Sequence, residues 1–394
     1  MEFSTKTQKL DSTFMDEILK AGANPDLISF AGGLPNADVF PVEAIKQAAI
    51  KVLDTDGPAA LQYNITEGYR PLREYIAKRY YSKHPDVSAD NIIITNGSSQ
   101  GIDMIARLIL NPGDGLIMER PGYLGALQTF TMAEPTYHVV PVSENGVDVA
   151  AVETVLATAD PAPKLFYSVP NFQNPGGSTY SLETREALAE VLRGRDILFI
   201  EDNPYGEIRF AGKTLPNMMD YLGFQVISLG SFSKVLSPGM RMGWMCASPE
   251  IIKGIIGVKG GTDMHSNYLT QRILYQYLMD NDFDAHIQRT IDVYREKCEL
   301  MLGELEKAIP AGFGATWTRP EGGMFIWMTL PEGVRAIDLL ACVKERGMYF
   351  IPGIPFYVDE PDMRTLRLNF SNSSNERIVE GVRIFGQAIS ELYC

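Results

Sequence analysis

One short segment of the sequence carries four side chains with complementary chemistry. Its eleven residues include the hydroxyls of Ser231 and Ser233, the amine of Lys234 and the guanidinium of Arg241. Hydroxyls and the arginine fork are good phosphate ligands. The lysine beside them either adds to a phosphate site or is a nucleophile that forms a Schiff base with a carbonyl. The spacing alone also allows a surface loop with a solvated lysine and arginine.

A second segment, Gly97-Ser-Ser-Gln100, is a candidate anion site. It lies between an expected strand, Ile92–Thr95, and an expected helix over residues 98–110. The start of a helix presents free backbone N–H groups and the positive end of the helix dipole, and both attract an anion. Ordinary N-capping by Ser98 or Ser99 is the alternative. No Gly-Lys-Ser/Thr follows, so the segment is not a Walker A loop.

A carboxylate and an amide follow two further expected strands. Asp202, with Tyr205 three residues later, comes directly after the strand 197–201, and Asn174 follows the strand 165–168. Side chains at the carboxyl ends of parallel strands face the ligand crevice of an open sheet. A buried Asp202 would keep a ring nitrogen opposite it protonated, because a negative charge favours the cationic form. Alternatively, Asp202 caps the Asn-Pro turn, and the turn around Asn174 needs no function.

The elements that must position these side chains alternate regularly up to about residue 280. Short apolar runs predict strands, and amphipathic stretches between them predict helices near residues 98–110, 123–133, 148–158 and 181–194, the last opened by Ser181. The expected strands are Ile92–Thr95, Gly115–Glu119, Thr136–Val140, Leu165–Ser168, Ile197–Glu201 and Val226–Leu229. This alternation is typical of a three-layer α/β domain, a mostly parallel sheet with helices on both faces.

The remainder of the chain predicts a smaller α+β domain. A long helix over about 282–308 precedes short strands at Gly314–Trp317, Met324–Thr329, 349–351 and Leu366–Phe370, with helices near 335–346 and 374–391. Near the N-terminus we expect a short helix over residues 11–20 and a helix Val42–Leu53 with Pro41 as its first residue. We therefore predict a large domain over residues 55–285 and a small domain, with an N-terminal arm, from residues 1–54 and 286–394.

Composition excludes several classes of partner. The 394 residues carry 35 Lys and Arg against 49 Asp and Glu, a formal net charge of −14. Such an acidic chain does not favour nucleic acid or anionic membrane, so any phosphate must be held by a local pocket. The four scattered cysteines give no disulfide framework or metal-ligand spacing, so no metal is expected. The start lacks a secretory signal and no long apolar run follows, which predicts a cytoplasmic protein with no membrane segment.

Seven features, in order along the chain, resemble the fold type I aminotransferases that use pyridoxal phosphate. They are Tyr63 with Gly68, Leu72 and Arg73; Gly97-Ser-Ser-Gln; Pro121-Gly-Tyr123; Asn171-x2-Asn174-Pro175; Asp202-x2-Tyr205; Ser231-x-Ser-Lys234 with Arg241; and Arg367. Each motif is weakly specific alone, whereas the ordered set with its lysine–arginine spacing is specific. The resemblance covers essentially the whole chain and implies pyridoxal 5′-phosphate as the cofactor.

The resemblance also implies a role for each residue. Lys234 would bind the cofactor as a Schiff base and move the proton between the substrate Cα and the cofactor. Asp202 would pair with the pyridine nitrogen and keep the ring an electron sink. Tyr205 and Asn174 would bind the ring oxygen, and Tyr123 would stack on the ring. The phosphate would be held by the backbone at Ser98 and by the side chains of Ser99, Gln100, Ser231, Ser233 and Arg241.

Substrate and partner contacts follow from the same resemblance. Arg367 would grip the substrate α-carboxylate with both arms of its guanidinium, next to Asn174 and Gly33. Tyr63 is similar to the tyrosine that reaches the phosphate of the neighbouring subunit, which implies a homodimer with shared active sites. The implied reaction is ping-pong transfer of an amino group between an L-amino acid and a 2-oxo acid.

The N-terminal segment is similar to the 2-aminoadipate, kynurenine and aromatic aminotransferases. The similarity lies in Ile28–Asn36 and in the helix ending Glu17-Ile-Leu-Lys20. In that subgroup an arginine often precedes this glutamate and helps to read an acidic or bulky side chain, whereas here the position is Asp16. A carboxylate at that position would repel an acidic substrate side chain, although aromatic, aliphatic and 2-aminoadipate-like substrates all belong to the subgroup.

Two alternatives keep the cofactor and change the function. One is a β-lyase or decarboxylase, since the cofactor activates every bond at Cα; Arg367 favours transamination because it fixes the carboxylate that a decarboxylase must release. The other is a non-catalytic regulatory domain that binds the cofactor as a ligand. The acidic charge is unfavourable for the DNA-binding form of such a regulator.

Overall fold

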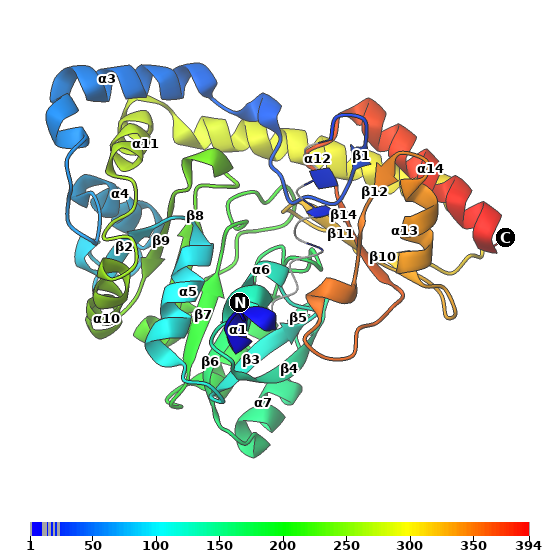
Figure 1. Cartoon of the computed structure of the whole chain (residues 1–394), viewed down its shortest axis with the longest axis horizontal. Coiled ribbons are helices and arrows are strands. Elements are labelled where there is room, and N and C mark those ends of the chain that lie inside the picture. The colour runs from blue at the N-terminus through cyan, green and yellow to red at the C-terminus, as the bar shows by residue number, and fades with distance from the viewer. Residues whose placement is uncertain (1, 10–13, 15–16, 19, 22–23, 394) are drawn as a thin grey trace.

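A computed structural model of the chain describes residues 2–9, 14, 17–18, 20–21 and 24–393. Its largest element is an eight-stranded sheet (Figure 1). In spatial order the strands are β2 (Ile92–Thr95), β9 (Gly243–Cys246), β8 (Val226–Ser231), β7 (Leu198–Asp202), β6 (Pro163–Ser168), β3 (Gly115–Arg120), β4 (Thr136–Ser143) and β5 (Gly146–Val147). The five strands from β8 to β4 run parallel, and β9 is antiparallel to both of its neighbours.

The strands on one side of the sheet are buried along their whole length because helices cover the sheet. Every residue of β2, β8 and β9 is buried, as expected for strands enclosed between layers. The helices of this part are α4 (Arg70–Tyr80), α5 (Ser98–Ile109), α6 (Leu124–Thr131), α7 (Val149–Thr158), α8 (Leu182–Leu192), α9 (Met219–Leu222), α10 (Pro249–Gly260) and α11 (Tyr268–Asp280). Ser181 caps α8 as predicted, since its Oγ accepts a hydrogen bond from the N–H of Thr184 at 3.2 Å.

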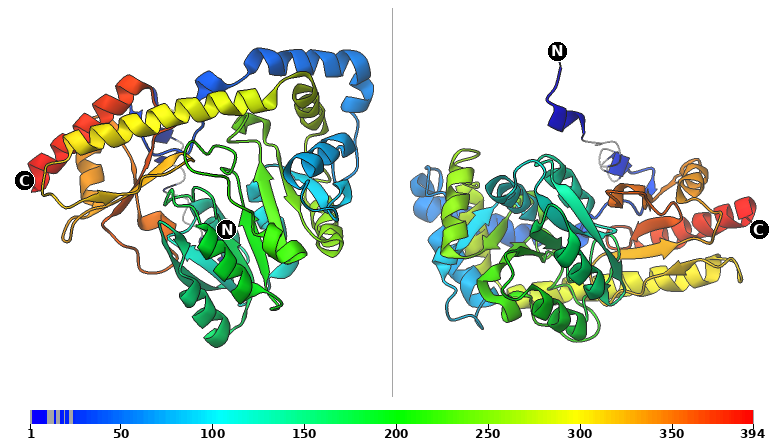
Figure 2. Two further views of the ribbon diagram at one scale, coloured as in Figure 1. Left: turned by 180° about the vertical axis from the view of Figure 1, so that it is seen from behind. Right: turned by 90° about the horizontal axis from the view of Figure 1, so that it is seen from below.

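The last third of the chain forms a second, antiparallel sheet. Its order is β10 (Thr316–Trp317), β11 (Phe325–Thr329), β14 (Thr365–Asn369) and β13 (Ile351–Pro352). Two long helices, α12 (Phe283–Ala308) and α14 (Asn375–Tyr393), pack against each other in both views of Figure 2, and α13 (Ala336–Lys344) packs on α14. β1 (Ile28–Ser29) pairs in parallel with β12 (Met348–Tyr349), so both chain ends build this smaller unit.

These features confirm the predicted fold class, although some elements differ locally from the prediction. The strand predicted at 349–351 is two short strands, β12 and β13, separated by Phe350. The helix α3 (Val42–Ala60) runs beyond the predicted Val42–Leu53, with non-helical backbone at Asp56, and Pro41 is its N-cap. Of the predicted helix 11–20, residues 14, 17, 18 and 20 are described and are helical, whereas Asp16 lies outside the described residues. The domain limits stay predictions.

A four-residue helix, α1 (Thr5–Gln8), begins the described chain. Among the helices of the described residues, none is both long enough and apolar enough to cross a membrane.

Candidate active site

One cavity of about 230 Å³ collects most of the predicted site residues. It lies where the parallel strands β6, β7 and β8 end, as expected for an open α/β sheet, and β14 of the small sheet supplies a further side chain. The predicted residues that line it are Gly33, Ser98, Ser99, Tyr123, Asn174, Asp202, Tyr205, Ser231, Ser233, Lys234, Arg241 and Arg367. Residues more than three hundred positions apart in the sequence therefore meet at a single site.

Asp202, the last residue of β7, presents one carboxylate oxygen without a partner. The hydroxyl of Tyr167 donates a 2.7 Å hydrogen bond to Oδ2, whereas Oδ1 is buried and has no partner among the described residues. Burial raises the pKa of Asp202 to about 6, although the hydroxyls of Tyr167 and Ser98 act to lower it. Oδ1 lacks a hydrogen-bond donor, and a protonated ring nitrogen would be such a donor.

Lys234 lies in the loop after β8 and points into the cavity. Its Nζ donates a 2.7 Å hydrogen bond to the carbonyl oxygen of Gly33. Burial lowers the pKa of Lys234 to about 8, and the positive charges of Arg367 and Arg241 lower it further. A lysine with such a pKa is partly neutral near physiological pH and can act as a nucleophile or a base. Gly33 packs closely against Phe325, since a Cβ at position 33 would lie 2.9 Å from Cζ of Phe325.

Arg367 on β14 is a buried cation held by neutral groups. Its Nη1 donates a 2.6 Å hydrogen bond to Oδ1 of Asn174, and its Nη2 donates to the carbonyl of Ala31. The guanidinium lies 4.3 Å from the ring centroid of Phe325 and 5.0 Å from that of Phe356. Burial lowers its pKa to about 10. Its Nε has no partner among the described residues, so an incoming carboxylate would supply the missing acceptor and the missing charge.

Two tyrosines border the space between Asp202 and Arg367. Burial raises the pKa of Tyr205 well above its usual range, and the Asn174 side chain only partly offsets this. Burial likewise raises the pKa of Tyr123, and a hydrogen bond with Ser99 acts to lower it. Both hydroxyls therefore stay protonated at neutral pH and are available as donors.

The start of α5 forms an anion cup. The N-cap is Gly97, at φ +81°, so Ser98 and Ser99 occupy the first helical turn and neither is the N-cap. Their backbone N–H groups belong to the set that a helix leaves without intrahelical acceptors. Arg241 closes the cup in a left-handed conformation, φ +54°, and its Nη2 donates a 3.0 Å hydrogen bond to the carbonyl of Asn96. A Cβ on Gly97 would lie 2.8 Å from that nitrogen, so the close approach requires glycine.

The sequence matches the family model for aminotransferase class I and II over residues 25–385. The chain belongs to this aminotransferase family. Among its relatives is aromatic-amino-acid aminotransferase 1 of Thermococcus litoralis, which is 37% identical over 99% of this chain and 94% of that protein.

Two solved structures show the same fold over the whole chain. The α-aminoadipate aminotransferase of Thermus thermophilus, complexed with N-(5′-phosphopyridoxyl)-L-leucine, is 36% identical, with a TM-score of 0.91 over 99% of this chain and 97% of that one. The kynurenine aminotransferase of Pyrococcus horikoshii, with pyridoxamine phosphate (PMP), gives 37% identity and a TM-score of 0.93 over 100% and 98%. These findings confirm the sequence-based predictions of an aminotransferase and of pyridoxal phosphate as its cofactor.

Gln100 is a predicted phosphate ligand of the aminotransferase that the structure does not bring into the cavity. Its Oε1 instead accepts hydrogen bonds from the N–H of Asn96 at 2.8 Å and from Nζ of Lys259 at 3.0 Å. Its Nε2 donates to Oδ2 of Asp263 at 2.7 Å. Lys259 and Asp263 come from α10 and the turn after it, and no local pattern in the sequence indicates that this turn lies next to α5.

Tyr63 of the aminotransferase also lies outside the cavity of the single chain. Its side chain is 76% exposed, and its ring meets that of His265 edge-on at 5.9 Å. Its expected contact with a neighbouring subunit stays a prediction.

The aminotransferase cavity has apolar lining that the sequence motifs did not single out. Ile18, Leu34, Leu124 and Val169 line it. Ile18 and Leu34 fall inside the two N-terminal segments that carry the subgroup resemblance, which was the available signal for them.

Proposed function

We propose that Lys234 is the lysine that binds pyridoxal phosphate and that Asp202, Tyr205, Asn174 and Arg367 complete the catalytic centre. The observation that carries this assignment is the unpartnered, buried Oδ1 of Asp202 in the same cavity as the amine of Lys234. Bound pyridoxal phosphate withdraws electrons from the substrate Cα and so makes its proton removable.

Each residue has a task that its surroundings support. Asp202 would hold a proton on the ring nitrogen, because a buried carboxylate favours a cation opposite it. Tyr205 and Asn174 donate hydrogen bonds toward the ring oxygen. Lys234, whose pKa of about 8 leaves part of it neutral, would take the proton from the substrate Cα as a general base and return it as a general acid. Arg367 orients the substrate by binding its α-carboxylate.

The phosphate site is the cup at the start of α5. Ser99, Ser231, Ser233 and Arg241 offer side-chain donors, and the backbone N–H of Ser98 adds one at the positive end of the helix. Ser231 and Ser233 are held together, because Oγ of Ser231 accepts a 3.1 Å hydrogen bond from the N–H of Ser233. This local cluster explains how a chain with a net charge of −14 binds a dianion.

We further propose that the preferred amino acids have aromatic or aliphatic side chains. Ile18, Leu34 and Leu124 give the cavity apolar walls beyond the catalytic groups. Among the described lining residues the cations are Lys234, Arg241 and Arg367, and each already has a task. A second carboxylate on the substrate would therefore enter an apolar wall without a counter-ion.

A homodimer with shared active sites is part of the proposal. Tyr63 and three apolar side chains near it in the sequence or the structure, Leu61, Ile65 and Met264, are each at least half exposed. A second copy packed on this surface would cover them and bring Tyr63 toward the partner's phosphate cup. We also propose a cytoplasmic location, consistent with free thiols at Cys246, Cys298 and Cys342.

A half-reaction screen tests the substrate proposal. Amino acids are added singly to the holoenzyme, and loss of the visible absorption of the lysine-bound cofactor is followed. Leucine, phenylalanine, tyrosine and kynurenine should convert the cofactor rapidly, and glutamate and 2-aminoadipate slowly. Rapid conversion by either acidic amino acid would disprove the apolar assignment. Lys234→Ala should bind no cofactor covalently, whereas Lys253→Ala, which alters an exposed lysine on α10, should behave as wild type.

A further inference from the structure

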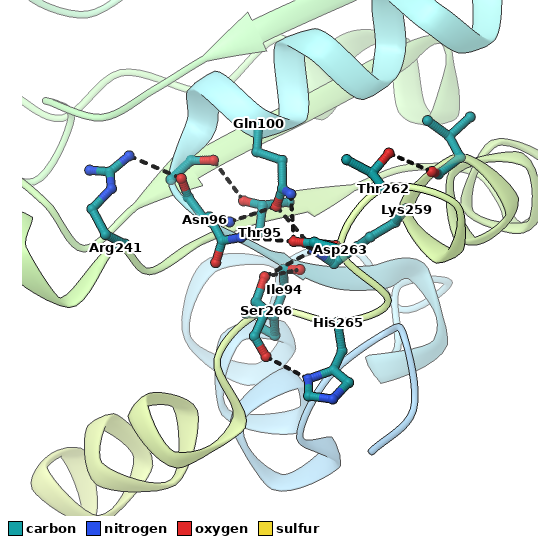
Figure 3. Close-up of polar contacts among 12 residues, drawn as sticks. Ile94, Thr95, Asn96, Gln100, Arg241, Lys259, Thr262, Asp263, His265 and Ser266 are labelled. Atoms are coloured by element: carbon teal, nitrogen blue, oxygen red, sulfur yellow. Dashed lines mark hydrogen bonds and ion pairs between the residues drawn. The ribbon is translucent and has the colours of Figure 1, made fainter. Parts of the chain in front are cut away.

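Lys259 on α10 is a buried cation outside the catalytic cavity. Its relative exposure is 0%. Its Nζ lies 3.0 Å from Oε1 of Gln100, from Oγ of Ser266 and from both carboxylate oxygens of Asp263, as Figure 3 shows. Burying an unpaired ammonium is costly, so the acceptors that surround Lys259 account for its place in the core. A lysine that served only to keep the surface soluble would be exposed, whereas Lys259 is buried.

The turn after α10 places Asp263 next to Lys259. The carbonyl of Lys259 accepts hydrogen bonds from the N–H groups of Thr262, Asp263 and Met264 at 3.0, 3.0 and 3.1 Å. Met264 has the left-handed conformation, φ +65°, that reverses the chain. This turn brings the carboxylate of Asp263 back to the ammonium of Lys259, near the end of α10.

The carboxylate of Asp263 also contacts the two residues that flank the anion cup. Oδ2 of Asp263 accepts hydrogen bonds from Nδ2 of Asn96 at 2.8 Å and from Nε2 of Gln100 at 2.7 Å. Oε1 of Gln100 accepts from the N–H of Asn96 at 2.8 Å, and the carbonyl of Asn96 accepts from Arg241. Asn96 and Gln100 flank the three cup residues Gly97, Ser98 and Ser99, so both ends of the cup are tied to Asp263 (Figure 3).

We propose that Lys259 and Asp263 are positioning residues that fix the anion cup and Arg241 in the geometry that receives the cofactor phosphate. Lys259 also neutralises Asp263, whose carboxylate would otherwise stand behind the cup and repel the phosphate. This inference rests on the proposed assignment of the cup to the phosphate. It adds a second layer, built from α10 and its turn, that touches neither cofactor nor substrate.

Titration of the cofactor-free, full-length protein with pyridoxal phosphate and with pyridoxal tests the proposal. Pyridoxal lacks the phosphate and so reports on Lys234 and the ring site alone. Lys259→Met should raise the Kd for pyridoxal phosphate roughly tenfold or more, the low end of the losses seen when groups that orient metal ligands are removed. Its Kd for pyridoxal should stay within twofold of the wild-type value. Lys253→Met removes the same charge from an exposed position on α10 and should leave both constants unchanged.

Gln100→Leu supplies a second variant that removes the same link without burying an unpaired carboxylate. It should weaken the binding of pyridoxal phosphate but not that of pyridoxal. If Lys259→Met does not fold, this variant alone tests the positioning role. Unchanged binding of pyridoxal phosphate, or equal weakening of both ligands, would overturn the positioning role. The wild-type titration distinguishes a failure of the proposed function from a failure of the positioning role. If wild type bound neither ligand, the assignment of the cavity to the cofactor would fail.

Discussion

Nη1 of Arg367 donates a 2.6 Å hydrogen bond to Oδ1 of Asn174, and this contact joins the two sheets at the active site. Arg367 belongs to β14 of the small sheet, whereas Asn174 follows β6 of the large one. Because the arginine is anchored by an amide and a carbonyl, it keeps its full charge for an incoming carboxylate. If Arg367 binds the substrate as proposed, the position of the substrate depends on the packing of the small sheet against the large one.

Arg367→Lys should impair substrate binding while leaving the cofactor in place. A lysine keeps the charge but loses the planar fork that binds a carboxylate through two hydrogen bonds. We expect kcat/KM to fall about 100-fold, equivalent to about 2.7 kcal/mol of transition-state stabilisation, with a higher KM and an unchanged visible cofactor spectrum. Steady-state kinetics and absorption measure both.

Arg364→Lys is the matched control for this change. Arg364 lies three residues before Arg367 and pairs with Asp362, outside the cavity. Its replacement should leave kcat/KM within twofold of wild type. Equal losses in the two variants would show that β14 had been disturbed and would contradict a carboxylate-binding role for Arg367.

The site could be predicted where chemistry follows directly from strand ends. Asp202 and the segment from Ser231 to Arg241 come immediately after apolar strands, and parallel strands end at one edge, so their convergence follows from topology. Gln100 could not be placed in this way. The direction of its side chain is set by Lys259 and Asp263, about 160 residues later in the chain.

Strand β9 is a second feature that the local sequence could not predict. Gly243–Cys246 is short and contains no β-branched residue, so it gives no period-two pattern and is not among the predicted strands. It becomes a strand because β2 and β8 offer it hydrogen bonds on both edges. Tertiary context, which supplies those edges, outweighs its local propensity.

Asp202→Asn should stabilise the cofactor-free protein at neutral pH. The pKa of Asp202 is raised from about 4 in the unfolded chain to about 6 in the folded one. The folded state therefore binds the proton more tightly, and stability is lost as the pH rises between these values. At pH 8 the variant should be more stable than wild type by up to about 3 kcal/mol, an order-of-magnitude conversion of the pKa shift.

Urea unfolding of the two cofactor-free proteins between pH 4 and pH 8 measures this difference. It should shrink as the pH falls to about 4, where Asp202 is protonated in the folded state and about half protonated in the unfolded one. Asp86→Asn, which removes a carboxylate at an exposed position, supplies the control. A variant that is less stable than wild type at pH 8 would argue that the charge of Asp202 is compensated in the folded protein.

Cofactor capture by Lys234 should depend on pH with a midpoint near 8. Only the neutral amine attacks a carbonyl, and burial together with Arg367 and Arg241 lowers the pKa of this lysine to about 8. The rate of capture by the cofactor-free protein should therefore rise through pH 8 and then level off. Arg367→Met removes one of the two charges and should move the midpoint upward, while Arg364→Met should leave it unchanged. A midpoint that does not respond to Arg367→Met would contradict a contribution of Arg367 to the pKa of Lys234.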